Sequence, residues 1–381
     1  MPAIPPPSDA PAPDGPRRSP APPPAPSPSP SPSPSPVTVL PLTGLGEVRE
    51  GADLAELLAG ALGPLAPREG DVLCVSTKIV SKALGLRVAP EERAAAIARA
   101  TVRTVARRLH TRVVTSVVQI ASGPVMAAAG VDSSNAPDGP LLLPEDPDAC
   151  ARELREGLVR RLGVELGVVL TDTSSRIWRV GVSDIALGAA GVAALEDLRG
   201  GFDADGRALT VTVRNLADEL AAAADLVKGK AGGIPAALVR GVPGACAGDV
   251  PARELSRTGA DDWFRRPSLE SVWVALGLAP AQEPIARMSP EPAPERIARA
   301  LEVAALPRPG RGPYRASAAE VTRPSGGRHI VVECADGSAA SLADAAVLAE
   351  RIRTALGAES LGEALPEIPV LICPDPEEAP R

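Results

Sequence analysis

Three short polar segments interrupt runs of small apolar residues in the middle of this chain. They lie at 76–82 (STKIVSK), 130–135 (GVDSSN) and 171–173 (TDT). A charged group within an apolar segment is costly unless it finds a partner, so we expect these segments to meet in the fold. Their lysines, aspartates, amide and hydroxyls are the groups of a metal-assisted phosphate site. The combination predicts nucleotide chemistry without a P-loop.

Strand-like and helix-like segments alternate along the chain, which predicts an α/β or mixed α+β fold. After a first ordered segment at 37–40, we predict strands at 71–75, 112–120, 168–170, 209–213 and 237–239. Helices are predicted at 91–109, 151–162 and 216–227. Arg99, Arg103 and Arg107 are spaced by four on the first of these helices, so we interpret them as its solvated face.

Proline divides the chain into three predicted parts. Residues 1–36 hold 17 of the 44 prolines and end in a Ser-Pro repeat, so we predict a disordered tail, with a ligand for a proline-reading module as the alternative. Residues 37–264 form the predicted functional domain. Residues 265–381 form a smaller α/β extension, with helices at 269–278, 295–305 and 342–355 and strands at 329–332 and 369–373. His329 is interpreted there as a hydrogen-bonded structural residue.

Composition excludes several classes of protein. The formal charge of −7 gives no general reason to bind nucleic acid, and no segment approaches the ~20 apolar residues needed to cross a membrane. Five dispersed cysteines without a CxxC pair indicate reduced thiols, so we expect a cytoplasmic protein. Two histidines exclude an HExxH site. Neither a P-loop, nor a GxSxG motif, nor a complete GxGxxG motif is present.

The charged residues of the polar segments are the candidate site. Lys78 and Lys82 are four apart just after a predicted strand, so on a helical turn they would face one side and could hold phosphate oxygens. Asp132 and Asp172 each follow an apolar segment, and with the Thr173 hydroxyl they offer the hard oxygen ligands that Mg²⁺ or Mn²⁺ prefers. The alternatives are surface lysines and aspartates that cap turns.

Several collinear motifs resemble a known family, coenzyme F-420-0:L-glutamate ligase. The resemblance spans about residues 37–264 and rests on 70–73 (GDVL), 78–82 (KIVSK), 129–132 (AGVD) with Asn135, 142–148 (LLPEDPD), 171–179 (TDTSSRIWR) and 222–230 (AAADLVKGK). It implies a ligase with a mixed α/β fold of its own and a homodimeric assembly. The expected partners are GTP, L-glutamate and coenzyme F-420-0, with neither nucleic acid nor membrane.

The resemblance also implies roles for individual residues. GTP would contact Leu45, Gly46, Glu47, Val48, Thr77, Lys82, Asn135, Lys228, Gly229 and Lys230. Asp132 and Asp172 would hold one Mg²⁺ or Mn²⁺, Thr173 would reach a second, and K⁺ is a further candidate. Lys82, Asp132 and Asp172 are the expected catalytic residues. The expected reaction activates the precursor's carboxylate as an acyl phosphate, and glutamate addition then forms an amide and, in later rounds, γ-glutamyl linkages.

The sequence departs from the family pattern at a few positions. Where the family commonly reads Thr-Asp-Thr-x-Gly-Arg-x-Trp-Arg-x-Gly-Gln-Thr-Asp, this chain has Ser175 for the first glycine and Val182-Ser183 for Gln-Thr; Val213 replaces a common glutamate. Ser175 would strain a turn if that glycine has positive φ. These departures are the support for an alternative function, a catalytically impaired homologue kept as a nucleotide-binding or assembly subunit. A third possible function, that of an NAD-type oxidoreductase, is supported only by the α/β alternation.

Actinobacterial relatives carry a nitroreductase-like, flavin-binding domain after the ligase. Residues 288–306 resemble its start, but Arg287 is all that remains of the expected phosphate-binding arginines, and the chain ends after about half of that domain. We therefore expect that residues 265–381 are a shortened, degenerate extension that does not bind FMN.

Overall fold

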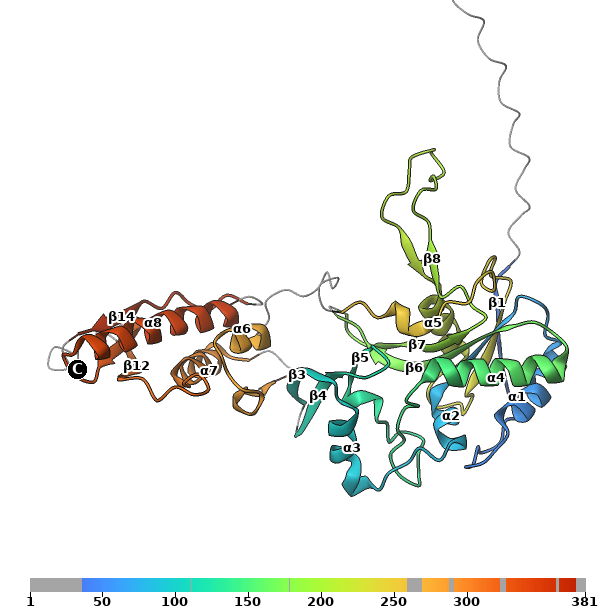
Figure 1. Ribbon diagram of the computed structural model, residues 1–381, viewed down its shortest axis with the longest axis horizontal. Coiled ribbons are helices and arrows are strands. Elements are labelled where there is room, and N and C mark those ends of the chain that lie inside the picture. Colours follow the sequence, from blue (N-terminus) through green and yellow to red (C-terminus); the bar gives the residue numbers. More distant parts are fainter. Residues whose placement is uncertain are drawn as a thin grey trace, which may run out of the picture. The chain divides into compact units, whose positions relative to one another are not determined.

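The computed structural model describes residues 36–110, 112–177, 179–258, 269–287, 291–322, 327–360 and 363–374 (Figure 1). The predicted disordered tail lies outside the described residues, apart from its last position. Within the described residues the fold is mixed α/β, as the alternation of segments predicts. No helix in this part of the chain is long and apolar enough to cross a bilayer.

A five-stranded mixed sheet forms the centre of the fold, in the order β1-β10-β2-β6-β7. Its strands are β1 (Thr38–Pro41), β2 (Val72–Ser76), β6 (Gly167–Ser175), β7 (Val182–Ala190) and β10 (Ala236–Arg240). Only β2 and β6 run parallel, and their register pairs Ser76 with Thr171. The carboxyl ends of these two strands therefore open at the same edge of the sheet.

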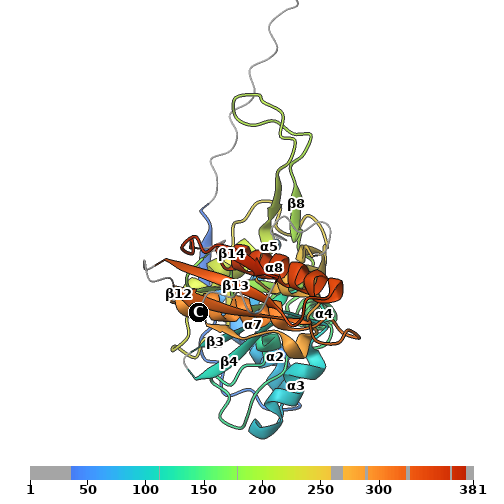
Figure 2. The same ribbon diagram turned by 90° about the vertical axis from the view of Figure 1, so that its left-hand side faces the viewer.

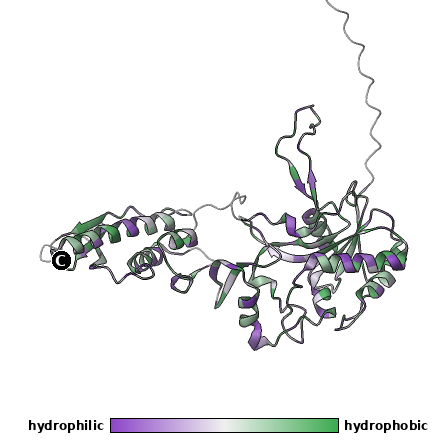
Figure 3. Ribbon diagram, in the orientation of Figure 1, coloured by the Kyte–Doolittle hydropathy of each residue, from purple (hydrophilic) through white to green (hydrophobic). Residues whose placement is uncertain are grey.

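Helices cover both faces of this sheet (Figure 1). The helices α1 (Leu54–Leu62) and α4 (Pro147–Leu162) pack against one face of the sheet. Leu73 and Val75 of β2 point into the core on that face. The helix α5 (Leu216–Lys228) packs on the other face against Val72 and Cys74. Because alternate residues of β2 enter two different cores, the strand reads as an unbroken apolar run. The colouring in Figure 3 shows polar and apolar residues side by side along these helices, as one-sided burial requires.

A second sheet contains the clearest correction to the sequence predictions. The predicted helix 91–109 ends early: α3 spans Arg93–Ala100, and β3 (Arg103–His110) follows it. The β-branched segment after Ala100 favours a strand over a helix, and β3 pairs with β4 (Val113–Gln119). Arg103 and Arg107 therefore do not lie on a helical face. The sheet is completed by β5 (Val125–Ala127) and the short β11 (Ala286–Arg287).

The predicted strand at 209–213 is also wrong for most of its length. The strand β9 begins only at Val213 and runs to Asn215, paired with β8 (Leu195–Asp197). Residues 198–212 form a hairpin arm in which turns replace strand structure, for example where Gly206 N–H bonds to the Asp203 carbonyl. The apolar residues of 209–213 have no core to pack on in the described chain: Val211 is 74 % exposed.

The C-terminal elements form a three-stranded sheet, β12-β13-β14, with helices against it (Figure 2). They are α6 (Leu269–Ala275), α7 (Ala293–Ala305), α8 (Ala339–Glu359), β12 (Ala316–Thr322), β13 (Arg328–Cys334) and β14 (Val370–Cys373). All but β12 were predicted. His329 is buried on β13, but neither ring nitrogen has a hydrogen-bond partner among the described residues, so its interpretation as a hydrogen-bonded residue is wrong.

Candidate functional site

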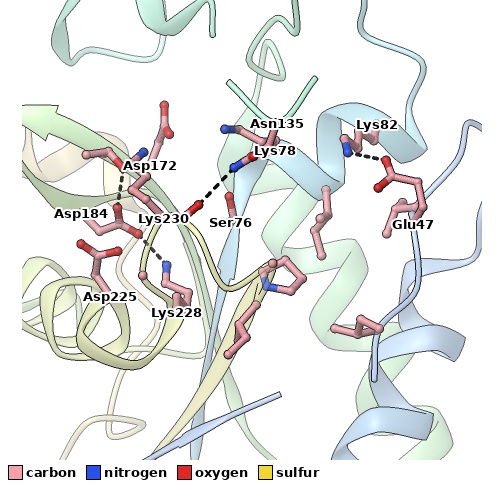
Figure 4. Close-up of a pocket in the computed structure, with 18 of the residues that line it drawn as sticks. Glu47, Ser76, Lys78, Lys82, Asn135, Asp172, Asp184, Asp225, Lys228 and Lys230 are labelled. Atoms are coloured by element: carbon pink, nitrogen blue, oxygen red, sulfur yellow. Dashed lines mark hydrogen bonds and ion pairs between the residues drawn. The ribbon is translucent and has the colours of Figure 1, made fainter. Parts of the chain in front are cut away.

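A cavity of about 460 Å³ opens where β2 and β6 end (Figure 4). The chain passes from β2 directly into α2 (Thr77–Ala83), while Asp172 and Thr173 extend β6 past the end of β2. Residues 45–48 after β1 and residues 228–235 before β10 close the other sides. Ligand sites of α/β proteins commonly form at the carboxyl ends of such parallel strands.

Lys78 and Lys82 enter the cavity from the same side of α2, as their spacing predicts. Lys78 Nζ lies 2.7 Å from Oδ2 of Asp132 and 2.8 Å from the Ser134 carbonyl oxygen. Lys82 is only 8 % exposed and forms an ion pair with the more exposed Glu47. The two ammonium groups are thus held by different loops, and both face the same space.

The cavity also receives two more lysines, Lys228 and Lys230. These four are all the lysines that the 381-residue sequence contains, against 36 arginines (40 basic residues less four). A chain that otherwise uses arginine therefore concentrates its lysines at one place. The ammonium group is a compact charge that fits between phosphate oxygens, whereas guanidinium is larger and planar. This use of residue types was readable from the sequence, and the motif analysis missed it.

Asp172 is part of the cavity wall, and Asp132 lies beside it, outside that wall. Both line a small adjoining space of about 10 Å³, together with Thr77 and Lys78. Burial raises the pKa of Asp172 to about 6, and the carboxylates of Asp184 and Asp132 add to the shift. Burial also acts to raise the pKa of Asp132, but hydrogen bonds from Lys78 and Ser134 outweigh it and hold that pKa below its usual value. Of these two carboxylates, Asp172 therefore has the weaker stabilisation of its charged form.

The carboxylate oxygens of Asp132 and Asp172 suit a divalent cation whose remaining ligands are waters or phosphate oxygens. Among the described residues, no group of three or more histidine, cysteine or acidic side chains is arranged to hold a metal by itself. Two carboxylates with a nearby hydroxyl match Mg²⁺ or Mn²⁺, which are commonly bound through one or two carboxylates plus phosphates and waters. The raised pKa of Asp172 agrees with a position that lacks positive charge.

A buried network behind Thr173 was not predicted. Asp184 on β7 is 5 % exposed and forms an ion pair with Lys228, which is 4 % exposed. It accepts hydrogen bonds from the hydroxyls of Thr171, at 2.8 Å, and Thr173, at 2.9 Å. The antiparallel register of β6 and β7 places Asp184 directly opposite Thr173. The available signal was the family motif itself, whose final aspartate aligns with Asp184.

Most of the other predicted contacts also line the cavity, namely Leu45, Gly46, Glu47, Val48, Asn135 and Gly229. Asn135 has positive φ, and its side-chain amide donates to the Lys230 carbonyl oxygen at 3.3 Å, which links two loops of the site. Thr77 does not line the main cavity. Its hydroxyl donates to the Thr171 carbonyl oxygen at 2.9 Å, so it connects β2 to β6. Lining residues outside the prediction are Ser76, Ile79, Pro137, Asp184, Asp225, Gly233, Ile234 and Pro235.

The expected strain at Ser175 is absent. Ser175 is the last residue of β6, pairs with Val182, and has no positive φ, so the backbone does not require glycine there. Val182 and Val213 are both exposed and lie outside the cavity lining. The departures from the family pattern therefore leave the described cavity wall intact.

Comparison with known proteins gives one consistent result. The family model described as F420-0:Gamma-glutamyl ligase matches residues 44–241. The coenzyme F420:L-glutamate ligase of Methanopyrus kandleri is 41 % identical over 239 residues, which cover 58 % of this chain and 94 % of that protein. The proteins of the same name from Archaeoglobus fulgidus and Haloarcula marismortui are each 39 % identical, over 60 % and 62 % of this chain and 97 % and 96 % of their own lengths. The matched family region contains every residue assigned above to the cavity.

Proposed function

The chain belongs to the F420-0:Gamma-glutamyl ligase family, and from that premise we propose that it uses GTP and a divalent metal to join L-glutamate to coenzyme F420-0. It is a ligase of coenzyme F420 biosynthesis that acts by glutamate ligation. The proposal concerns the energy source, the metal and the chemical route.

The convergence of all four lysines on one cavity carries the proposal. A nucleoside triphosphate brings about four negative charges, and compact ammonium groups can neutralise its oxygens from several sides. Lys78, Lys82 and Lys230 would hold the phosphates. The loop at 45–48 offers backbone groups and the apolar side chains of Leu45 and Val48 as a wall for the nucleoside.

The reaction follows from the chemistry of an unactivated carboxylate. A carboxylate oxygen of coenzyme F420-0 attacks the γ-phosphorus of GTP, the bond from that phosphorus to the β-phosphate oxygen breaks, and GDP leaves. The deprotonated amino group of glutamate then attacks the acyl carbon and expels inorganic phosphate, which leaves an amide bond. Further rounds on the added glutamate would give γ-glutamyl linkages. Asp132 and Asp172 would hold one Mg²⁺ or Mn²⁺ and Thr173 would reach a second. Such ions neutralise phosphate oxygens and align the displacement.

Incubation of the purified full chain with GTP, Mn²⁺, L-glutamate and coenzyme F420-0 tests this proposal. Mass spectrometry should detect products heavier by whole glutamyl residues, and GDP should appear in equal amount. Omitting GTP or adding a chelator should abolish both. GTP binding without glutamyl products would instead favour an impaired homologue.

For residues 265–381 we propose that no FMN is bound. Arg287, the residue expected to contact a phosphate, forms a 3.2 Å ion pair with Glu295. Arg299 pairs with Glu291 and Glu359, and Arg351 donates to backbone carbonyl oxygens of the helix ends. These arginines already have partners within the extension. Calorimetric titration with FMN should give no saturable heat, and a stoichiometric transition would refute this part.

A further inference from the structure

Asp184 lies in the wall of the cavity, and the family resemblance implied no role for it. We propose that Asp184 is a positioning residue: it fixes the hydroxyl of Thr173 so that a lone pair of the oxygen faces the cavity. The inference rests on the proposed function in one respect, since the cation that would use this oxygen is the one that accompanies the nucleotide.

The direction of each hydrogen bond follows from the groups involved. An ionised carboxylate only accepts hydrogen bonds, so the 2.9 Å contact between Asp184 Oδ1 and Thr173 Oγ1 uses the threonine's single proton. An ammonium group only donates, so Lys230 Nζ, 2.7 Å from the same oxygen, uses one of its lone pairs. The hydroxyl therefore acts as an acceptor on its cavity side. A metal ligand must present a lone pair in the same way.

The contacts around Asp184 hold its carboxylate in one position. Lys228 is buried beside Oδ2 and also donates to Thr171 Oγ1 at 2.6 Å, while the Thr171 hydroxyl donates to Oδ2 at 2.8 Å. A buried charge pair with these additional hydrogen bonds holds a defined geometry. Hydrogen-bond partners of metal ligands orient those ligands, and their loss commonly weakens metal binding by about 10–100-fold.

Mn²⁺ binding, measured by electron paramagnetic resonance on the full chain with saturating GDP and no other substrate, tests the inference. Thr173→Val should weaken Mn²⁺ binding by about 10–100-fold, while Thr173→Ser, which keeps the hydroxyl, should bind as the wild type does. Asp184→Asn should weaken Mn²⁺ binding by a similar factor. The D184N/T173V double variant should bind Mn²⁺ no more weakly than either single variant. Asp218→Asn removes a half-buried carboxylate of α5 outside the cavity, and should leave Mn²⁺ binding unchanged.

Wild-type Mn²⁺ affinity in Thr173→Val, or in folded Asp184→Asn, would overturn the inference, as would losses that add in the double variant. If Asp184→Asn fails to fold because Lys228 loses its counter-charge, D184N/K228Q takes its place, with K228Q alone as its reference. The measurement uses neither glutamate nor coenzyme. Failure of the proposed ligation would therefore leave the Mn²⁺ result standing, and the reverse is also true.

Discussion

The ammonium nitrogen of Lys78 lies 2.7 Å from Oδ2 of Asp132, and this contact joins α2 to the loop at 131–135. The same nitrogen donates to the carbonyl and hydroxyl oxygens of Ser134. Lys78 is also part of the cavity wall, so one side chain both orders a loop and offers charge to a ligand. Its two roles make it the most informative lysine to replace.

Lys78→Met should lower kcat/KM for GTP-dependent glutamylation by about 10²–10³-fold, because it removes a cation from the phosphate site and the partner of Asp132. Lys78→Arg keeps the charge but not the compact shape and should recover only part of the loss. Steady-state kinetics on variants with unchanged melting temperature make the comparison. Near wild-type turnover in Lys78→Met would contradict the placement of phosphate at this helix.

Amine-selective acetylation should report on the cavity directly, because all four lysines line it. Lys230 is exposed and should react first, whereas Lys228, which is 4 % exposed and ion-paired with Asp184, should react last. Saturating GTP with Mn²⁺ should protect Lys78, Lys82 and Lys230 by mass-spectrometric peptide mapping. Labelling with Mn²⁺ alone serves as the control. Equal labelling with and without nucleotide would count against a GTP site here.

The sequence predicts those site residues that can be recognised from their immediate neighbours in the chain. The lysines of α2 and the carboxylates Asp132 and Asp172 stand out as charges beside apolar runs, and the fold brings them to one cavity edge. Asp184 does not stand out, because it starts an apolar run twelve residues after Asp172. Only the register of β6 against β7 brings it opposite Thr173.

The element predictions failed where local preference and tertiary pairing disagree. Alanine and arginine extend the helical pattern of α3 up to Leu109, but Thr101, Val102, Thr104 and Val105 favour an extended backbone, which pairing with β4 then stabilises. Likewise, the apolar residues at 209–213 predict a strand, yet they fall in an arm whose turns place them away from the described cores. Pairing with the neighbouring strand β4 decides the first case, and the lack of a core beside the arm in the described chain decides the second.

Cys74 should resist thiol reagents in the native protein. It is fully buried on β2, its Sγ lies 3.6 Å from the Leu220 carbonyl oxygen, and burial raises the pKa of its thiol to about 12. The reactive thiolate is therefore almost absent at neutral pH. Labelling with an aromatic disulfide should leave Cys74 unmodified until denaturant unfolds the central sheet, while Cys246, only partly buried, serves as the native-state comparison. Rapid native labelling of Cys74 would refute its place in the core.

Divalent metal should bind this protein more weakly below a pH of about 6. Because the folded-state pKa of Asp172 is raised to about 6, the folded protein holds a proton there that the unfolded chain would release near pH 4. Without metal, this group's contribution to stability therefore falls as pH rises through that window. Bound Mn²⁺ must displace the proton, so its affinity should rise with pH by up to about tenfold per unit until Asp172 is ionised near pH 6, and should then level off.

Calorimetric titrations with Mn²⁺ and GDP between pH 5 and 8 measure this profile. Asp172→Asn should bind Mn²⁺ weakly at every pH, lose the step near pH 6, and abolish glutamylation without unfolding the chain. A step that survives this substitution would assign the titration to another group.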